Sequence, residues 1–181
     1  MREQNKFLRT SFRYIFEFMT AGFIGWIYEV VTVWILYGEF VNRGMLWLPI
    51  IPIYAVGAFL LLLLLRKKRN PLFIFFFSAA ITTLFELGVS YLLEFIFHRQ
   101  FWTYEGWWFS ILDRSCGISS AIFGIFAVIY FWVLHPVSEK LSQKLPVWFC
   151  SVFSSVSVIA VMTDLIISEK NAIGGDNFEY N

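Results

Sequence analysis

The sequence predicts an all-α integral membrane protein, a polytopic bundle of about five transmembrane helices that cannot work as a soluble domain. Hydrophobic residues make up 59% of the 181 residues and charged residues only 15%, and the mean hydropathy is +0.67. A soluble domain carries roughly 25% charged residues, which cover its surface. The 22 Phe, 8 Trp and 8 Tyr residues agree with a membrane location, because aromatic side chains are favoured at the membrane interface.

Five apolar segments are each long enough to cross a bilayer, whose hydrocarbon core of about 30 Å requires roughly 20 helical residues. We expect helices because backbone in lipid must satisfy its own hydrogen bonds, and because the segments lack the alternation of barrel strands. The segments lie near Phe12–Tyr37, Met45–Leu65, Pro71–Phe97, Ile111–Leu134 and Val147–Ile167. Residues 1–168 are predicted to form a single bundle, followed by a polar C-terminal tail at residues 169–181.

The second segment has an irregular start. Asn42-Arg43-Gly44 is typical of a turn, and Pro49 and Pro52 follow it. Proline is tolerated in the first turn of a helix, so the regular helix is predicted to begin near Pro52. Non-helical backbone at membrane depth needs protein or water around it, which predicts a cavity near residues 42–51.

Basic residues predict the orientation of the chain. Ten of the 14 Lys and Arg residues fall in the N-terminal segment, in residues 66–69 and in the loop 135–146, which share one side of the predicted topology. Basic residues are enriched on the cytoplasmic side, so we expect the N-terminus in the cytoplasm. Five spans then place the C-terminus outside.

Charged residues inside the apolar segments predict a polar site. Glu29 and Glu86 are expected about 25 Å and 22 Å along two helices that both run outward, hence at similar depth. Arg43 and Arg114 open the second and fourth spans from the outer side, so acids and arginines could meet in one layer. The residues of this predicted binding site are Glu29, Asn42, Arg43, Glu86, Glu94, Arg114 and Asp164.

Two interpretations of this layer stay open at this point. The charges could pair only to hold helices together, since arginine and carboxylate form planar, two-pronged pairs. Alternatively, they could line a pocket in which acids exchange protons or bind a cation while arginines hold an anion, because ionisable residues inside a membrane are generally functional. A short likeness between residues 26–30 and 83–87 also suggests a parallel repeat of the first and third helices.

Other features have plainer interpretations. The aromatic loop His98–Ser110 is predicted either as a belt at the outer headgroups or as a lid over an outward-facing pocket. The sequence has no C-x-x-C pair and only two separate histidines, so no metal site is predicted. Cys116 and Cys150 are expected at opposite ends of their helices and therefore as free thiols. Gly22, Gly25, Gly117 and Gly124 are expected to allow close helix packing.

Several stretches together resemble a known family of small bacterial membrane proteins, the putative ABC-transporter type IV family (CmpB-type permeases). The likeness covers roughly residues 20 to 168, and Asn-Arg-Gly followed by Pro-x-x-Pro-Ile-Tyr is its most specific part. It rests on Gly25–Glu29, Gly38–Gly44, Pro49–Gly57, Glu86, Glu94, Trp102, Tyr104, Arg114–Cys116 and Asp164. Glycine is expected at three positions where this chain has Leu48, Ala55 and Asp113, which puts tight backbone contacts there in doubt.

The resemblance implies a permease-like component of a transporter in the bacterial cell membrane. It assigns no substrate, no cofactor and no catalytic residue. The chain has no G-x-x-x-x-G-K-[ST] phosphate loop, so a separate cytoplasmic ATPase subunit would have to dock on its short inner loops. The partners expected are therefore the lipid bilayer, such an ATPase and a second copy of the chain in a homo-oligomer, but no nucleic acid.

Three hypotheses for the function follow. The first is a transport component with a polar pocket reached from outside, and the second is a small structural or regulatory membrane subunit. The third is a membrane-embedded enzyme acting on lipid, in which Glu29 or Glu86 would be a general base and an arginine would hold phosphate. No nucleophile–base motif supports an enzyme, so the chain is expected not to be one.

Overall fold

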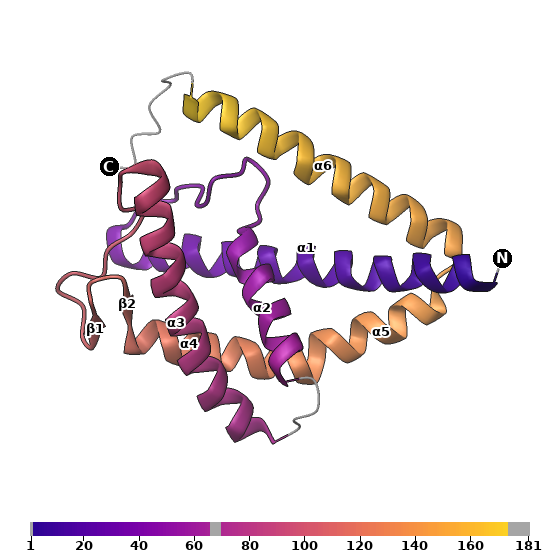
Figure 1. Ribbon diagram of the computed structural model, residues 1–181, viewed down its shortest axis with the longest axis horizontal. Helices are drawn as coiled ribbons and strands as arrows, with labels where there is room; N and C mark the ends of the chain where they lie inside the picture. Colours follow the sequence, from indigo (N-terminus) through magenta and orange to yellow (C-terminus); the bar gives the residue numbers. More distant parts are fainter. Residues whose placement is uncertain (1, 66–69, 174–181) are drawn as a thin grey trace. The chain divides into compact units, whose positions relative to one another are not determined.

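The computed structural model describes residues 2–65 and 70–173, with side chains for 3–65 and 70–168 (Figure 1). The predicted basic segment 66–69 lies outside the described residues. Of the predicted polar tail, residues 174–181 also lie outside them.

The fold is all-α, as predicted. Two strands of two residues each, β1 and β2, pair antiparallel with Ser110 opposite Cys116. The elements are α1 (Arg2–Tyr37), α2 (Pro52–Leu65), α3 (Pro71–Phe97), β1 (Ser110–Ile111), β2 (Ser115–Cys116), α4 (Gly117–Ile129), the π-helical turn η1 (Tyr130–Leu134), α5 (His135–Lys144) and α6 (Val147–Ile173).

Four helical stretches in the described part of the chain are long and apolar enough to cross a membrane. They are Glu3–Tyr37, Pro71–Phe97, Gly117–Lys144 and Val147–Ser168. The apolar helix α2 has only 14 residues, which is short of the roughly 20 needed to span hydrocarbon. The chain is therefore a multi-pass membrane protein with four to five spans.

The second and fourth predicted segments begin as helices later than the apolar pattern indicates. α2 begins at Pro52, and residues 38–51 before it are irregular, as the two prolines indicated. α4 begins at Gly117 rather than near Ile111. Leu112 and Asp113 have positive φ angles of 53° and 54°, which no α-helix accommodates. The hairpin formed by β1 and β2 therefore takes the place of a first helical turn.

The predicted inner loop 135–146 is also mostly helical. It contains the polar helix α5, which follows α4 through the π-helical turn η1. Pro136 is the second residue after η1 inside this continuous helical stretch, where its missing N–H removes one helical hydrogen bond. Gly22 and Gly25 of α1 have side-chain or backbone neighbours within 4 Å, as close packing requires.

By contacts, the chain divides into two compact units. The first comprises the described residues up to Val56 and from His135 onward, and the second comprises Gly57–Leu134. The predicted single bundle concerns how these units pack together, and it stays a prediction.

In the first unit, α5 and the first turns of α6 pack on the N-terminal half of α1 (Figure 1). Aromatic rings hold this packing: Phe12 of α1 is stacked on Phe16 and is edge-on to Phe149 and Phe153 of α6. Aromatic pairs at these separations add to the energy of burying their area.

In the second unit, α3 packs on α4. Asn70 caps the N-terminus of α3, its side chain accepting from Leu72 and Phe73 N–H. The core of this unit is formed by Leu61, Leu65, Ile74 and Ala127. Gly124 allows the closest approach, since a Cβ there would lie 2.9 Å from the carbonyl oxygen of Phe75.

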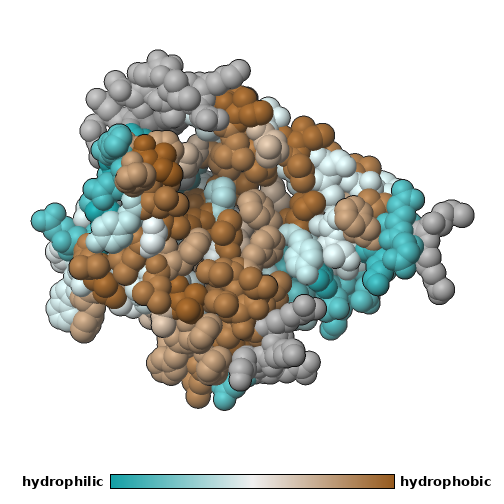
Figure 2. Space-filling view, in the orientation of Figure 1, coloured by the Kyte–Doolittle hydropathy of each residue, from teal (hydrophilic) through white to brown (hydrophobic). Residues whose placement is uncertain are grey.

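The distribution of side chains is that of a membrane protein. Large apolar side chains are exposed along the helices, whereas small polar ones are buried between them, including Ser78, Ser90, Ser119 and Ser138. Small residues allow membrane helices to pack closely where lipid supplies no hydrophobic driving force. In Figure 2, hydrophobic residues cover much of the visible face, and hydrophilic ones gather around the N-terminal end of α1 and α5.

Replacing Gly124 with alanine should destabilise the second unit. The new Cβ would meet the Phe75 backbone, which cannot move as a flexible side chain can. Overpacking of this kind costs typically about 1–3 kcal/mol. The matched control is Gly88→Ala on α3, where a Cβ meets nothing within 4 Å. Thermal unfolding in detergent should show a lower Tm for Gly124→Ala alone; equal Tm values for both variants would contradict the packing.

Candidate functional site

The C-terminal part of α1 binds the start of α2 through a carboxylate. The Tyr54 hydroxyl donates to Oε1 of Glu29 at 2.7 Å, and the Arg43 guanidinium lies 3.9 Å from Oε2 of the same carboxylate. Glu29 and Arg43 are each about one-third exposed. Glu29 and Arg43, two of the predicted site residues, therefore lie together, and Tyr54, which the prediction did not include, joins them.

Two neighbouring contacts bind the irregular segment 38–51 to the same stretch of α1. The Trp26 indole N–H donates to the side-chain oxygen of Asn42 at 2.6 Å, and the Ile51 N–H donates to the Gly22 carbonyl at 3.0 Å. Gly25 faces the Tyr54 ring so closely that a Cβ would lie 2.3 Å from Cγ of that ring. A glycine at this position is what lets Tyr54 reach Glu29.

α6 supplies the third support of the segment. Asp164 is buried, and its two carboxylate oxygens accept from the backbone N–H groups of Trp47 and Leu48 at 3.2 and 2.8 Å. A single carboxylate thus satisfies two consecutive N–H groups that have no helix to pair them. Asp164 is a structural anchor of the irregular segment.

An open hollow lies beside this segment, in agreement with the predicted cavity. It has a volume of about 570 Å³, and its lining is mostly apolar. The lining residues are Trp47, Leu48, Pro49, Ala160, Thr163, Asp164 and Ile167. Of the predicted site residues, Asp164 lines it, whereas Glu29 and Arg43 do not.

In the second unit, Glu86 lies on α3 and is only 8% exposed. The Ser115 hydroxyl donates to its Oε2 at 2.6 Å, and the Tyr104 hydroxyl donates to its Oε1 at 3.0 Å. Tyr104 comes from the aromatic loop and also contacts the Ser119 hydroxyl at 3.3 Å. Two hydroxyl donors therefore offset part of the free-energy cost of burying this carboxylate.

Arg114 lies between three side chains of α3. Its guanidinium forms an ion pair with Glu94, donates to the Ser90 hydroxyl at 3.0 Å and lies over the Tyr91 ring, 4.1 Å from the centroid. The planar guanidinium suits this combination of carboxylate, hydroxyl and aromatic face. Glu94 and Arg114, two of the predicted site residues, therefore form an ion pair.

The aromatic loop folds back on its own unit. The Trp102 indole N–H donates to the Arg114 carbonyl at 3.0 Å, and the Tyr104 N–H donates to the Asp113 carbonyl at 2.9 Å. Trp108 and Phe109 point outward. Tyr104 of the loop contacts Glu86, whereas Trp108 and Phe109 are exposed, and whether the loop is a belt or a lid stays a prediction.

Asp113 explains why a glycine was expected before the arginine. Its φ of 54° is in the left-handed region, which glycine adopts without strain and aspartate tolerates better than most residues. The Ser110 hydroxyl donates to the Asp113 carboxylate at 2.9 Å, which supports this turn. Ala55 is fully buried, so a small residue is retained where glycine was expected.

The predicted site residues thus form two clusters, one in each unit. The first contains Glu29, Asn42, Arg43 and the nearby anchor Asp164, and the second contains Glu86, Glu94 and Arg114. Glu29 and Glu86, the two acids of the proposed parallel repeat, each accept from a tyrosine hydroxyl. That the two clusters form one layer stays a prediction.

The sequence argument missed a third polar cluster in the first unit. Glu17 is completely buried, and its Oε1 accepts from the Ser138 hydroxyl and lies 3.0 Å from Nδ1 of His135. Glu17 lies near the inner end of the first predicted span and His135 directly follows the inner end of the fourth, so similar depth was the signal that could have paired them. This cluster joins α1 to α5.

The part of the chain that the structure describes contains no group of residues arranged as a metal site, and its two thiols are separate. No three His, Cys, Asp or Glu residues there are grouped as metal ligands. Cys116 and Cys150 are buried free thiols, and Cys116 caps α4 by accepting from the Ser119 N–H.

Comparison with known proteins identifies a family. The sequence profile described as "Putative ABC-transporter type IV" matches residues 16–169, which is most of the chain. No curated protein and no solved structure matches the chain significantly.

Replacing Asp164 with asparagine should loosen the irregular segment. Asparagine offers one acceptor oxygen, so one of the two N–H groups at Trp47 and Leu48 loses its partner, at a cost of about 1–3 kcal/mol. Trypsin should then cut faster after Arg43 in the detergent-purified protein. The control is Thr163→Val, the neighbouring residue that lines the same hollow. Equal cleavage rates for Asp164→Asn and the wild type would show that Asp164 does not anchor the segment.

Proposed function

The chain belongs to the family described as "Putative ABC-transporter type IV", and from this membership we propose that it is the permease-like component of a transporter. The observation that carries the proposal is the Glu29–Arg43–Tyr54 cluster. It places the Glu29 carboxylate and the Arg43 guanidinium, each about one-third exposed, at the junction between a long apolar helix and an irregular segment. Such a junction offers both charged groups and non-helical backbone to a polar solute.

The proposed location is the bacterial cell membrane, with the N-terminus in the cytoplasm and the C-terminus outside. The bias of Lys and Arg supports this orientation. The Glu29 cluster then lies in the outer half of the bilayer, because α1 begins inside and Glu29 lies eight residues before its last residue, Tyr37. The site would therefore be reached from the outer face.

The energy source proposed is a separate ATPase subunit. The sequence has no phosphate-binding loop of its own, so ATP hydrolysis requires another chain. A second copy of this chain is the other partner proposed. Affinity purification from the host membrane, followed by mass spectrometry, tests both partners.

The alternative is a small structural or regulatory subunit. It is favoured by the observation that Trp26, Asn42 and Asp164 all bind neighbouring segments of the same unit. Under this alternative, Glu29 and Arg43 would be needed for stability and not for movement of a solute.

The variant Glu29→Gln distinguishes a permease-like component from a structural or regulatory subunit. The glutamine carbonyl can still accept from the Tyr54 hydroxyl, so the fold should be retained while the negative charge is lost. In a deletion strain, wild-type chain should restore the distribution of small molecules between cells and medium, measured by untargeted mass spectrometry. Glu29→Gln and Arg43→Ala should fail to restore it, although both proteins reach the membrane at normal levels.

The matched control is Glu39→Gln, an identical charge change at an exposed residue of the irregular segment. It should restore the distribution fully. If Glu29→Gln and Arg43→Ala also restore it at equal protein level, the charges of this cluster take no part in transport.

A further inference from the structure

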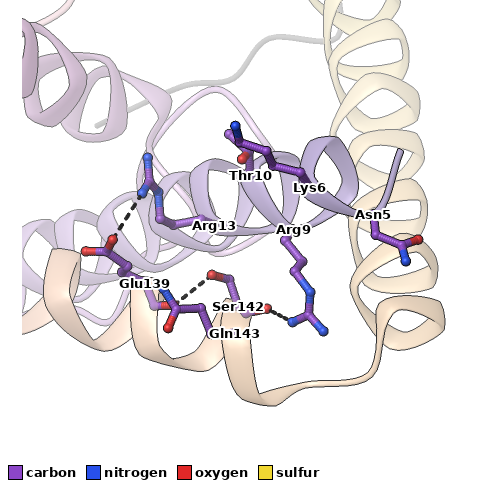
Figure 3. A pocket seen from close by; sticks show the side chains of 8 residues that line it. All are labelled: Asn5, Lys6, Arg9, Thr10, Arg13, Glu139, Ser142 and Gln143. Atoms are coloured by element: carbon purple, nitrogen blue, oxygen red, sulfur yellow. Dashed lines mark hydrogen bonds and ion pairs between the residues drawn. The ribbon is translucent and has the colours of Figure 1, made fainter. Parts of the chain in front are cut away.

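A basic hollow between α1 and α5 lies outside the clusters described above. Its volume is about 440 Å³, and its lining comes from the first turns of α1 and the last turns of α5 (Figure 3). The lining residues are Asn5, Lys6, Arg9, Thr10, Arg13, Glu139, Ser142 and Gln143. Three basic side chains therefore face one carboxylate, which leaves the hollow with a net positive charge.

The basic residues share one face of α1. Lys6, Arg9 and Arg13 are spaced by three and four residues, which places them in one row along a helix. All three line the same hollow in Figure 3. Their charges therefore act on one small volume.

Contacts along α5 hold the shape of the hollow. Arg9 donates to the Ser142 carbonyl, and Arg13 lies 4.0 Å from the Glu139 carboxylate. One turn further along α1, the buried Glu17 binds His135 and Ser138. The two helices are thus joined at three successive levels, and the hollow is a formed feature of this unit.

Part of the positive charge in the hollow is not neutralised by the protein. Lys6 is exposed and forms no ion pair or hydrogen bond within the residues that the structure describes. The buried Nε of Arg13 has no acceptor among those residues either. Donors of this kind, a guanidinium and an ammonium around one volume, match a phosphate group.

The aromatic residues near the hollow are of the kind found at a membrane interface. Phe12, next to Arg13, packs edge-on against Phe149 of α6, which places the start of α6 at the same height as the hollow. Trp148 precedes Phe149 and is 67% exposed, and Phe7 on α1 is 70% exposed. Exposed aromatic residues at the end of apolar helices mark the headgroup region. Basic hollows between helices at this level bind anionic headgroups.

We propose that the hollow between α1 and α5 binds the phosphate of an anionic phospholipid headgroup, with Lys6, Arg9 and Arg13 as its donors. The bound lipid would join α1 to α5 at their shared end. This site is independent of the proposed transport function.

The test measures lipid binding to the full purified chain. Nanodiscs are prepared with phosphatidylcholine alone or with phosphatidylglycerol at low mole fraction, and lipid retained by the protein is quantified by native mass spectrometry. Phosphatidylglycerol should be retained over phosphatidylcholine. Lys6→Gln should weaken that retention about fivefold to tenfold, since each basic residue near an anionic surface contributes separately.

Two variants control for charge and for folding. Lys140→Gln removes the same charge from an exposed residue of α5 that does not line the hollow, and it should leave retention unchanged. Lys6→Arg keeps the charge and should retain the lipid as wild type does. Equal weakening by Lys6→Gln and Lys140→Gln would overturn the proposal, since it would show general attraction only.

Two further arms decide the source of the phosphate. Inorganic phosphate at millimolar concentration should not displace phosphatidylglycerol. If it does so completely, the hollow is a site for soluble phosphate and the lipid proposal fails. Equal retention of phosphatidylcholine and phosphatidylglycerol would also overturn it.

Discussion

Charged and backbone polar groups at the depth of the hydrocarbon core must find their partners within the protein, because acyl chains offer none. This constraint shapes both units. Glu29 is met by Tyr54 and Arg43, Glu86 by Tyr104 and Ser115, and Glu17 by Ser138. Each carboxylate therefore brings together segments that are distant in sequence, and the positions of the irregular segment, the aromatic loop and α5 depend on these contacts.

The same contacts explain why the motif residues of the family occur together in this chain. Gly25 leaves space for the Tyr54 ring, Trp26 holds Asn42, and Glu29 holds both Arg43 and the Tyr54 hydroxyl. The stretch Gly25–Glu29 and the stretch Asn42–Tyr54 thus bind each other almost residue by residue. A structural role and a functional role are compatible here. The cluster that holds the irregular segment 38–51 on α1 also presents one carboxylate and one guanidinium beside non-helical backbone.

Much of this arrangement could be predicted from the sequence, because its signals are local. Apolar length predicted the helices, and the prolines predicted the start of α2 at Pro52. The charges inside the apolar segments indicated that acids and arginines could meet, but they did not specify the pairs Glu29–Arg43 and Glu94–Arg114. The rest depends on side-chain direction and on long-range contacts, which no local pattern encodes. The pairing of Glu17 with His135 and the start of α4 after the hairpin, instead of at Ile111, are of this kind.

The topology predicted from the sequence places the Glu29 cluster and the Glu86–Arg114 cluster at the same face of the membrane, away from the N-terminal end of α1. Single cysteines at the exposed positions Phe40, Phe109 and Phe7 report on these three places, since the native Cys116 and Cys150 are buried. The measurement is labelling of intact cells with a membrane-impermeant maleimide. With this topology, positions 40 and 109 should be labelled and position 7 should be protected. Labelling of position 40 or 109, but not of both, would contradict it.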